Sequence, residues 1–279
     1  MMDKEELYKK ISYIIHSNYI NPDKITAFSD EQADINKIKS REDVLNFLKS
    51  RYSDIAYNDD LKIYLIGIGG IGSHLAPLLG KIGRLSVQDR DTVSLDNVLS
   101  QGYDFSHVGY NKTDAIKTIA PISSGNFSFE ARERANIYIH AVDNMKSRME
   151  FTRMFVNSTS YKNYHDYEYS IEESKQEPTL LIDIRMSPTV YEFFINTMQT
   201  IPSYLDKFMF HDKDATPTQC GAALKPQLSY VGAGVLVECM KRMYSELHSN
   251  NAMIRKEASR GLHVCVHGGH FKIVEEPIM

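Results

Sequence analysis

A short apolar run that ends in closely spaced glycines constrains this chain more than any other feature. Leu61–Ile66 is almost continuously apolar, which is typical of a strand buried on both faces of a parallel sheet. The next residues fit the pattern GxGxxG, and Ser73–Leu79 then favours a helix. Glycines let the backbone approach phosphate oxygens, and a helix N-terminus offers unpaired N–H groups. The segment therefore predicts a nucleotide site at Gly67, Gly69, Gly70, Ile71 and Gly72.

The rest of the pattern predicts an α/β fold with a Rossmann-like, mostly parallel sheet and helices on both faces. Further strands are expected at Arg84–Gln88, Ile137–Val142, Leu180–Arg185 and Val190–Thr197, and a helix at Tyr230–Tyr244. The alternating segment around Gly268 and Gly269 predicts a C-terminal β-hairpin. We expect a small N-terminal helical module over residues 1–58 and one main domain over residues 59–279.

Charge and hydropathy exclude several classes of partner. Thirty-two Lys and Arg residues against 36 Asp and Glu give a formal net charge of −4, so no positive field exists to hold a nucleic acid. No apolar run reaches the roughly 18–20 residues that cross a bilayer, and the N-terminus lacks a secretory pattern. We therefore expect a cytoplasmic protein that binds neither nucleic acid nor a membrane.

Cysteine usage excludes two kinds of scaffold. The chain has three cysteines, Cys220, Cys239 and Cys265, and no CxxC pair. This number is too small for a disulfide framework or a four-cysteine zinc site, so no zinc is expected. Cys239 in an apolar helical run and Cys265 in an alternating strand are expected to be packing residues. Near Cys265, His263, His267 and His270 are interpreted as histidines at the solvent edge in preference to a metal site.

Two acidic residues extend the nucleotide prediction. Asp89 and Asp91 follow the second expected strand, where an acid can bind the ribose hydroxyls. Asp89 with the glycine segment suits any dinucleotide enzyme, including an NAD-dependent oxidoreductase.

The blocks after this acid distinguish among nucleotide enzymes. They run from Asp91 through Asn97 to Gln101, then to Gly109 and Lys112, and then to Asp143, Asn144 and Arg148. In this order they resemble the ThiF/MoeB superfamily, the adenylyltransferases related to ubiquitin-activating enzymes. The resemblance covers about residues 61–244. It implies ATP and Mg²⁺ as cofactors, with Asp89 on the ribose, Asn97 and Lys112 on the phosphates and Asp143 on the metal.

The residue types suit AMP transfer, because attack on the α-phosphate builds negative charge that cations must neutralise. Lys112 is the expected cation and Asp143 the expected Mg²⁺ ligand. The amides of Asn97 and Gln101 can donate to phosphate or position the other groups. Asn144 is assigned to the same site, and Arg148 is expected to hold either a loop or the nucleotide.

One position departs from the family pattern. Ser100 stands where the family has an arginine on the triphosphate. Arg84, Arg90 or an arginine of a partner subunit could replace it, and the loss also keeps a non-catalytic scaffold subunit as an alternative function.

The resemblance also implies a partner protein and a candidate nucleophile. Cys220, which precedes glycine in a polar setting, is a candidate to capture the activated carboxylate. The polar stretch at about residues 158–178 is interpreted as a crossover loop over the active site. We expect adenylylation of the C-terminal glycine of a small ubiquitin-like or sulfur-carrier protein, or of a peptide, by a homodimer or heterodimer. A scaffold subunit and an NAD-dependent oxidoreductase are the alternatives.

Overall fold

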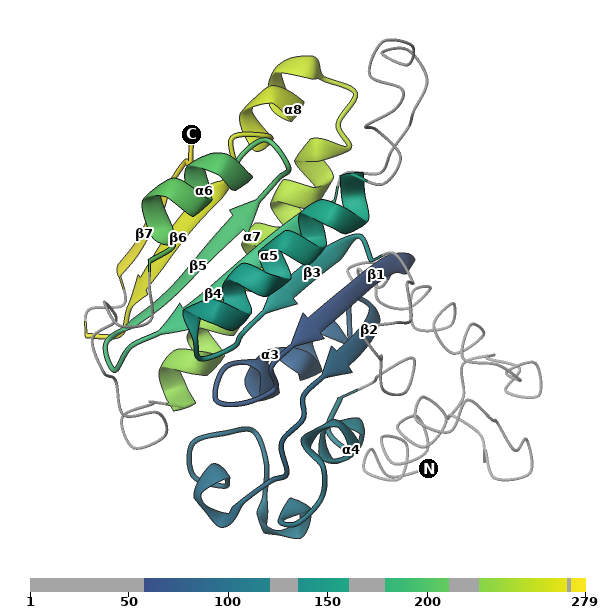
Figure 1. The fold of residues 1–279 in the computed structure, drawn as a ribbon, viewed down its shortest axis with the longest axis vertical. Coiled ribbons are helices and arrows are strands. Elements are labelled where there is room, and N and C mark those ends of the chain that lie inside the picture. The colour runs from purple at the N-terminus through teal and green to yellow at the C-terminus, as the bar shows by residue number, and fades with distance from the viewer. Residues whose placement is uncertain (1–57, 121–134, 161–178, 211–225, 270–271) are drawn as a thin grey trace, which may run out of the picture.

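A seven-stranded sheet forms the centre of the protein in the computed structural model, which describes residues 58–120, 135–160, 179–210, 226–269 and 272–279. The spatial order of the strands is β2-β1-β3-β4-β5-β6-β7 (Figure 1). Their bounds are β1 Asn58–Ile66, β2 Gly83–Gln88, β3 Ile137–His140, β4 Leu180–Met186, β5 Val190–Asn196, β6 Leu262–His267 and β7 Lys272–Glu276.

The predicted α/β fold and the C-terminal hairpin are confirmed, but the sheet is evenly mixed rather than mostly parallel. Strands β2, β1, β3 and β4 pair in parallel, whereas β4–β5, β5–β6 and β6–β7 are antiparallel. The change of direction begins where a three-residue turn joins β4 to β5, with Ser187 N–H donating to Val190 O at 2.8 Å. A turn this short permits only antiparallel pairing, since a parallel pair needs a crossover of a dozen residues or more.

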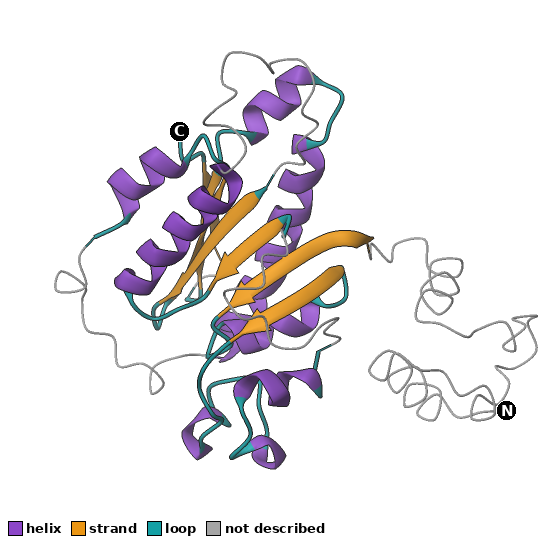
Figure 2. Cartoon of the chain, turned by 45° about the vertical axis from the view of Figure 1, so that its right-hand side comes forward, coloured by secondary structure: helices purple, strands orange, loops and turns teal. Residues whose placement is uncertain are grey.

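Helices cover both faces of the sheet, as predicted (Figure 1, Figure 2). Helices α3 (Gly72–Leu79) and α7 (Pro226–Leu247) lie on one face, and α5 (Met145–Ser160) and α6 (Ile201–Phe208) on the other. Short helices α4 (Lys112–Lys117) and α8 (Ala252–Ala258) lie outside these layers. The main apolar core fills the α3/α7 face, where Leu65, Leu75 and Leu236 are fully buried.

Helix α7 packs closely against β5 because it carries a glycine at the contact. A Cβ added at Gly232 would lie 2.2 Å from the ring of Tyr191, itself fully buried. Gly234, one half-turn further along the same helix, has nothing within 4 Å of an added Cβ. Only the first glycine is therefore required by packing.

Some predictions fall outside the described residues. The helical module at 1–58 lies outside them except for Asn58, which begins β1. Cys220 also lies outside them. The expected crossover loop begins later than predicted, since residues 158–160 belong to α5, and its remaining residues are not described. Within the described residues, no helix is long and apolar enough to cross a membrane.

Candidate functional site

The glycine segment lies where three parallel strands end side by side. Gly67 N–H donates to Gln88 O at the end of β2 (2.9 Å), and Ala141 N–H, just after β3, donates to Ile66 O (2.8 Å). Strands β2 and β3 flank β1 on opposite sides, so the chain leaves β1 in one direction and later returns on the other. Such a reversal opens a crevice at the C-terminal ends of the strands, which is the usual ligand site of an open α/β sheet.

Two glycines of this loop are required by the fold, and one is not. Gly67 has φ +84°, and an added Cβ would lie 2.8 Å from Ala141 O. A Cβ at Gly72 would lie 2.0 Å from Gly67 O. At Gly69, in contrast, an added Cβ meets nothing within 4 Å. The space beside Gly69 is therefore open to a ligand, and the fold itself does not explain the missing side chain.

Backbone donors line this open space. Within the described residues, no acceptor is assigned to the N–H groups of Gly69, Gly70 or Ile71, which precede α3. The Ser73 hydroxyl donates to Gly69 O (2.5 Å) and accepts from Gly102 N–H (2.8 Å). Unpaired N–H groups at a helix N-terminus attract anions. The loop is thus held in place by Ser73 while its own donors stay available.

Asp89 braces the loop from β2. Its Oδ2 accepts from Ile68 N–H and its Oδ1 from Asp91 N–H, both at 2.8 Å. The buried Tyr103 hydroxyl donates to Ile68 O on the other side (2.7 Å). Each carboxylate oxygen keeps a lone pair for a hydroxyl, so Asp89 can support the loop and still bind a ribose.

Lys112 is buried and is therefore not an ordinary surface lysine. It begins α4, and only 5% of the residue is exposed. Its Nζ lies 3.2 Å from Asp91 Oδ2, and its backbone N–H donates to Asp91 O (2.9 Å). Asp91 is itself exposed, and its contacts fix the position of the Lys112 ammonium group beside the Asp89 loop.

Asp143 is exposed at the end of the neighbouring strand β3. Asn144 Nδ2 donates to Asp143 Oδ1 (3.0 Å), and Asn144 Oδ1 accepts from Ser147 N–H (2.8 Å) in the first turn of α5. Asn144 therefore caps the helix and orients Asp143 at the same time. Within the described residues, Asp143 Oδ2 has no assigned partner. One carboxylate with an available oxygen near the predicted phosphate-binding loop fits the ligand preference of Mg²⁺.

The segment after Asp91 holds the two remaining predicted amide side chains. Asn97 Oδ1 accepts from Ser94 N–H (3.0 Å) in a short 3₁₀ turn. Gln101 follows that turn, and its Oε1 is buried with no hydrogen-bond partner within the described residues. Gly102, the next residue, contacts Ser73 through its N–H. A buried amide oxygen without a partner is able to accept a hydrogen bond from a ligand bound beside the glycine loop.

Ser100 does not reach out to replace an arginine. Only 5% of the residue is exposed, and its hydroxyl donates to Asp96 O (3.3 Å). Of the proposed substitutes, Arg84 lies at the N-terminal end of β2, opposite the edge that carries the loop. Arg90 follows Asp89 directly, with a side chain 98% exposed and 4.0 Å from Asp91. Arg90 is therefore better placed than Arg84 to replace the arginine.

Comparison with known proteins agrees with this geometry. Residues 59–161, which contain the glycine loop, Lys112 and Asp143, match the model of the ThiF family. The similarity to the ThiF family therefore covers the segment that holds the candidate site. Similar sequences include ubiquitin-like modifier-activating enzyme 5 of Oryza sativa subsp. japonica (42% identity over 67 residues) and of Arabidopsis thaliana (40% over 67 residues). Each match covers 23% of this chain and only 16% of the relative.

Solved structures of the same fold extend beyond the ThiF match. Escherichia coli MccB in complex with AMPCPP and MccA has a TM-score of 0.51 at 14% identity, over 78% of this chain and 64% of MccB. PaaA has a TM-score of 0.53 at 16% identity, over 100% of this chain and 84% of PaaA. At such identities the likeness establishes the fold alone.

Arg148 lies within the segment that matches the ThiF family, and its side chain is directed into the protein rather than toward the glycine loop. The buried guanidinium donates to the Asp183 carboxylate, to Ile184 O (2.9 Å) and to Val142 O. Val142 directly precedes Asp143. These contacts favour the loop-holding alternative for Arg148 over direct contact with the nucleotide.

Asp183, which the sequence reasoning missed as a functional candidate, lies at the centre of this network. Arg185 Nε (2.8 Å) and the Tyr204 hydroxyl (2.7 Å) both donate to its Oδ2, and His140 Nδ1 lies 3.0 Å from its Oδ1. Burial opposes ionisation of Asp183, but the guanidinium charges of Arg148 and Arg185, together with the contact with His140, hold its pKa well below the usual range. Burial lowers the pKa of His140 despite the nearby carboxylate. The signal in the sequence was a charged residue inside an otherwise apolar strand.

The remaining cysteines separate into two environments. Cys239 is buried in the main core, as predicted. Cys265 is only partly buried and lies beside His263 and Glu192, so the prediction of a simple packing residue is wrong. His263 is not at the open solvent edge either, since its ring stacks on Phe194 at 4.4 Å. Burial raises the pKa of the Cys265 thiol to about 11, with Glu192 contributing.

Proposed function

We propose that this protein uses ATP to adenylate a carboxylate, with the C-terminal residue of a peptide or of a small ubiquitin-like or sulfur-carrier protein as acceptor. One observation carries the proposal. The unpaired N–H groups of the glycine loop, the buried Lys112 and the exposed Asp143 lie at the same edge of the sheet. The ThiF match spans these residues. MccB, which shares the fold, has been solved with ATP and with MccA.

In this proposal each residue has a separate task. The N–H groups of Gly69, Gly70 and Ile71 hold phosphate oxygens, and Asp89 accepts the ribose hydroxyls. Lys112, held by Asp91, offsets the charge that develops on the α-phosphate. Asp143 holds Mg²⁺, which when bound supplies positive charge for the phosphates.

The reaction is a single displacement at phosphorus. An oxygen of the acceptor carboxylate forms a bond to the α-phosphorus of ATP, and the bond from that phosphorus to the bridging oxygen breaks. Pyrophosphate leaves with the bonding electrons, and the product is an acyl-adenylate. If Cys220 then takes the acyl group, its thiolate forms a bond to the acyl carbon and AMP leaves.

ATP–pyrophosphate exchange tests the proposal. We expect exchange of labelled pyrophosphate into ATP only when a peptide or ubiquitin-like protein with a free C-terminal carboxylate is present. The same acceptor carrying a C-terminal amide is the matched control and should give none. Measurable ATP binding without exchange, across a panel of such acceptors, would argue against adenylylation.

A non-catalytic scaffold remains the second candidate, and Ser100 is the observation that favours it. The position holds a short buried side chain instead of a cation, and the phosphates then depend on Lys112 and Arg90. Calorimetric titration with Mg-ATP separates the two candidates, because a scaffold need not bind the nucleotide. A separate titration with NADH tests the third alternative. If the chain binds Mg-ATP but leaves the fluorescence of added NADH unchanged, an NAD-dependent oxidoreductase is excluded.

A further inference from the structure

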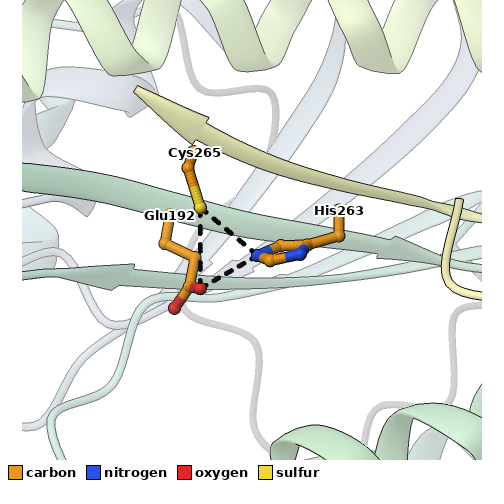
Figure 3. A group of neighbouring side chains, drawn as sticks. All are labelled: Glu192, His263 and Cys265. Carbon is orange, nitrogen blue, oxygen red and sulfur yellow. Dashed lines mark hydrogen bonds and ion pairs between the residues drawn. The ribbon is translucent and has the colours of Figure 1, made fainter. Parts of the chain in front are cut away.

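Three side chains of different chemistry converge on one point at the antiparallel end of the sheet. Glu192 of β5 and His263 and Cys265 of β6 direct one ligand atom each toward a common centre (Figure 3). His263 Nε2 lies 2.9 Å from Glu192 Oε1 and 3.4 Å from Cys265 Sγ, and that sulfur lies 3.8 Å from Glu192 Oε1. The cluster is separated from β1 and β2 by β3 and β4.

The antiparallel register produces this convergence. Glu192 is the direct strand partner of Cys265, so the two side chains project from the same face of the sheet. His263 lies two residues before Cys265 and therefore shares that face. Its own strand partner, Phe194, stacks against its ring with an interplanar angle of 9°. The aromatic contact fixes the imidazole with Nε2 toward the other two ligand atoms.

The arrangement does not fit a proton relay. In a Cys-His-acid triad the cysteine and the acid contact different ring nitrogens, so that the ring passes a proton between them. Here both Cys265 Sγ and Glu192 Oε1 contact the same nitrogen, Nε2. Three ligand atoms that meet at one point instead match the geometry of a shared cation.

The separations are close to those that a tetrahedral zinc ion imposes. Zinc bond lengths of about 2.3 Å to sulfur and about 2.0–2.2 Å to nitrogen and oxygen imply ligand-to-ligand separations of roughly 3.3–3.6 Å. The three observed separations, 2.9, 3.4 and 3.8 Å, bracket this range. Small side-chain movements are therefore sufficient to seat an ion.

We propose that Glu192, His263 and Cys265 form a binding site for one divalent transition-metal ion of the zinc type. A thiolate and a carboxylate together balance its two positive charges, and the thiol proton leaves to solvent on binding. The His263 and Glu192 side chains are 16% and 29% exposed, which gives the ion access and leaves a fourth position for water.

Neighbouring charges are compatible with a cation. The nearest arginine in register, Arg185, is the strand partner of Glu192 but is paired with Asp183 at 2.8 Å. Glu276 is the strand partner of His263 and adds a further negative charge on that side. The ion would tie β5 to β6 in the part of the sheet that contains only antiparallel pairs.

Cobalt substitution tests the site on the full chain. After chelation, we expect one Co²⁺ per chain, with a sulfur-to-metal charge-transfer band that Zn²⁺ removes by competition. Cys265→Ser should abolish the band, whereas Cys239→Ser and Cys220→Ser should keep it. His263→Gln should weaken Zn²⁺ binding by at least about 100-fold. Mutation of a residue that only supports a metal ligand already lowers metal affinity by roughly 10- to 100-fold.

Three outcomes would overturn the proposal. The first is the absence of a charge-transfer band in the unmodified chain, which does not depend on any variant folding. The second is a band that survives in folded Cys265→Ser, as judged by circular dichroism. The third is equal loss of Zn²⁺ affinity in His263→Gln and in His248→Gln, since His248 is an exposed residue in the turn after α7. The test is independent of ATP binding or pyrophosphate exchange.

Discussion

At the residue scale, the candidate nucleotide site depends on a few side chains whose surroundings differ sharply. Gly67 and Gly72 are glycines because backbone atoms occupy the place of a Cβ, whereas Gly69 faces open space. Lys112 is buried with one exposed partner, Asp91. These differences allow substitutions that separate folding from ligand binding.

Gly69→Ala is expected to fold normally and to bind ATP poorly. Its added methyl group meets nothing within 4 Å, so the free energy of unfolding should stay the same or rise by up to about 1 kcal/mol. The methyl group would occupy the path of the phosphates and reduce ATP affinity by roughly tenfold or more. Urea unfolding and calorimetry measure the two effects. Full ATP affinity in Gly69→Ala would contradict the assignment of this loop, and Gly72→Ala should lose stability itself.

Lys112→Met should lower the rate of pyrophosphate exchange by about 10²–10³-fold, the usual effect of removing one charge-stabilising contact. Methionine fills a similar volume, and the abandoned Asp91 is exposed, so the fold should tolerate the change. Lys117→Met is the matched control and should keep the rate, because Lys117 lies in the same helix with its side chain 40% exposed and paired with Asp114 at 2.8 Å. Equal rates in the two variants would remove Lys112 from the proposed mechanism.

At the scale of elements, helix α7 shows how one residue sets a packing distance. Gly232 lets the helix approach the Tyr191 ring on β5, while Gly234 faces away from the sheet. The helix runs over 22 residues and provides a large part of the main core. Its position therefore supports the same sheet that carries the candidate site.

Gly232→Ala and Gly234→Ala should change stability in opposite directions. The first places a methyl group against a buried ring, which should lower the free energy of unfolding by about 1–3 kcal/mol. The second should raise it by about 0.5–1 kcal/mol, because alanine favours a helix interior more than glycine. Chemical denaturation of both variants measures the difference, and a shared sign would show that the contact with Tyr191 is not close.

At the scale of the whole molecule, the Asp183 network connects four elements. His140 ends β3, Arg148 lies in α5, Arg185 in β4 and Tyr204 in α6. All meet one carboxylate that is fully buried. Through Arg148 the network also holds Val142, next to Asp143, so it connects the stability of the α5/α6 face to the geometry of the candidate metal ligand.

This network predicts how stability depends on pH. Because burial lowers the pKa of His140 in the folded chain, the unfolded chain takes up a proton first, at about pH 6.5. The free energy of unfolding should therefore fall as pH drops from 7 to 5, by at most about 2 kcal/mol for this histidine. Urea unfolding at a series of pH values measures the slope. His140→Gln should flatten the slope, whereas His248→Gln, at an exposed position, should not. Equal slopes in the two variants would refute the attribution of the pH dependence to His140.

The sequence by itself determined the strands and the glycine loop, and it predicted the residues of the candidate site. Their signals are local, because an apolar run that ends in glycine is set by neighbouring positions in the chain. The helices α5 and α6 were missed, since α5 carries many polar residues and α6 is short. The polar composition of α5 also explains why the crossover loop was expected to begin at about residue 158, although the helix continues to Ser160.

Only the tertiary structure decided what depends on pairing across the sheet. The register of β4 with β5 and of β5 with β6 places Asp183, Glu192, His263 and Cys265 on one face, although His263 and Cys265 lie about 70 residues from Glu192. The tertiary structure also directs the Arg148 side chain to Val142 O and buries Lys112 beside Asp91. A spacing pattern reports which residues share a face of one element, whereas long-range pairing decides which faces meet.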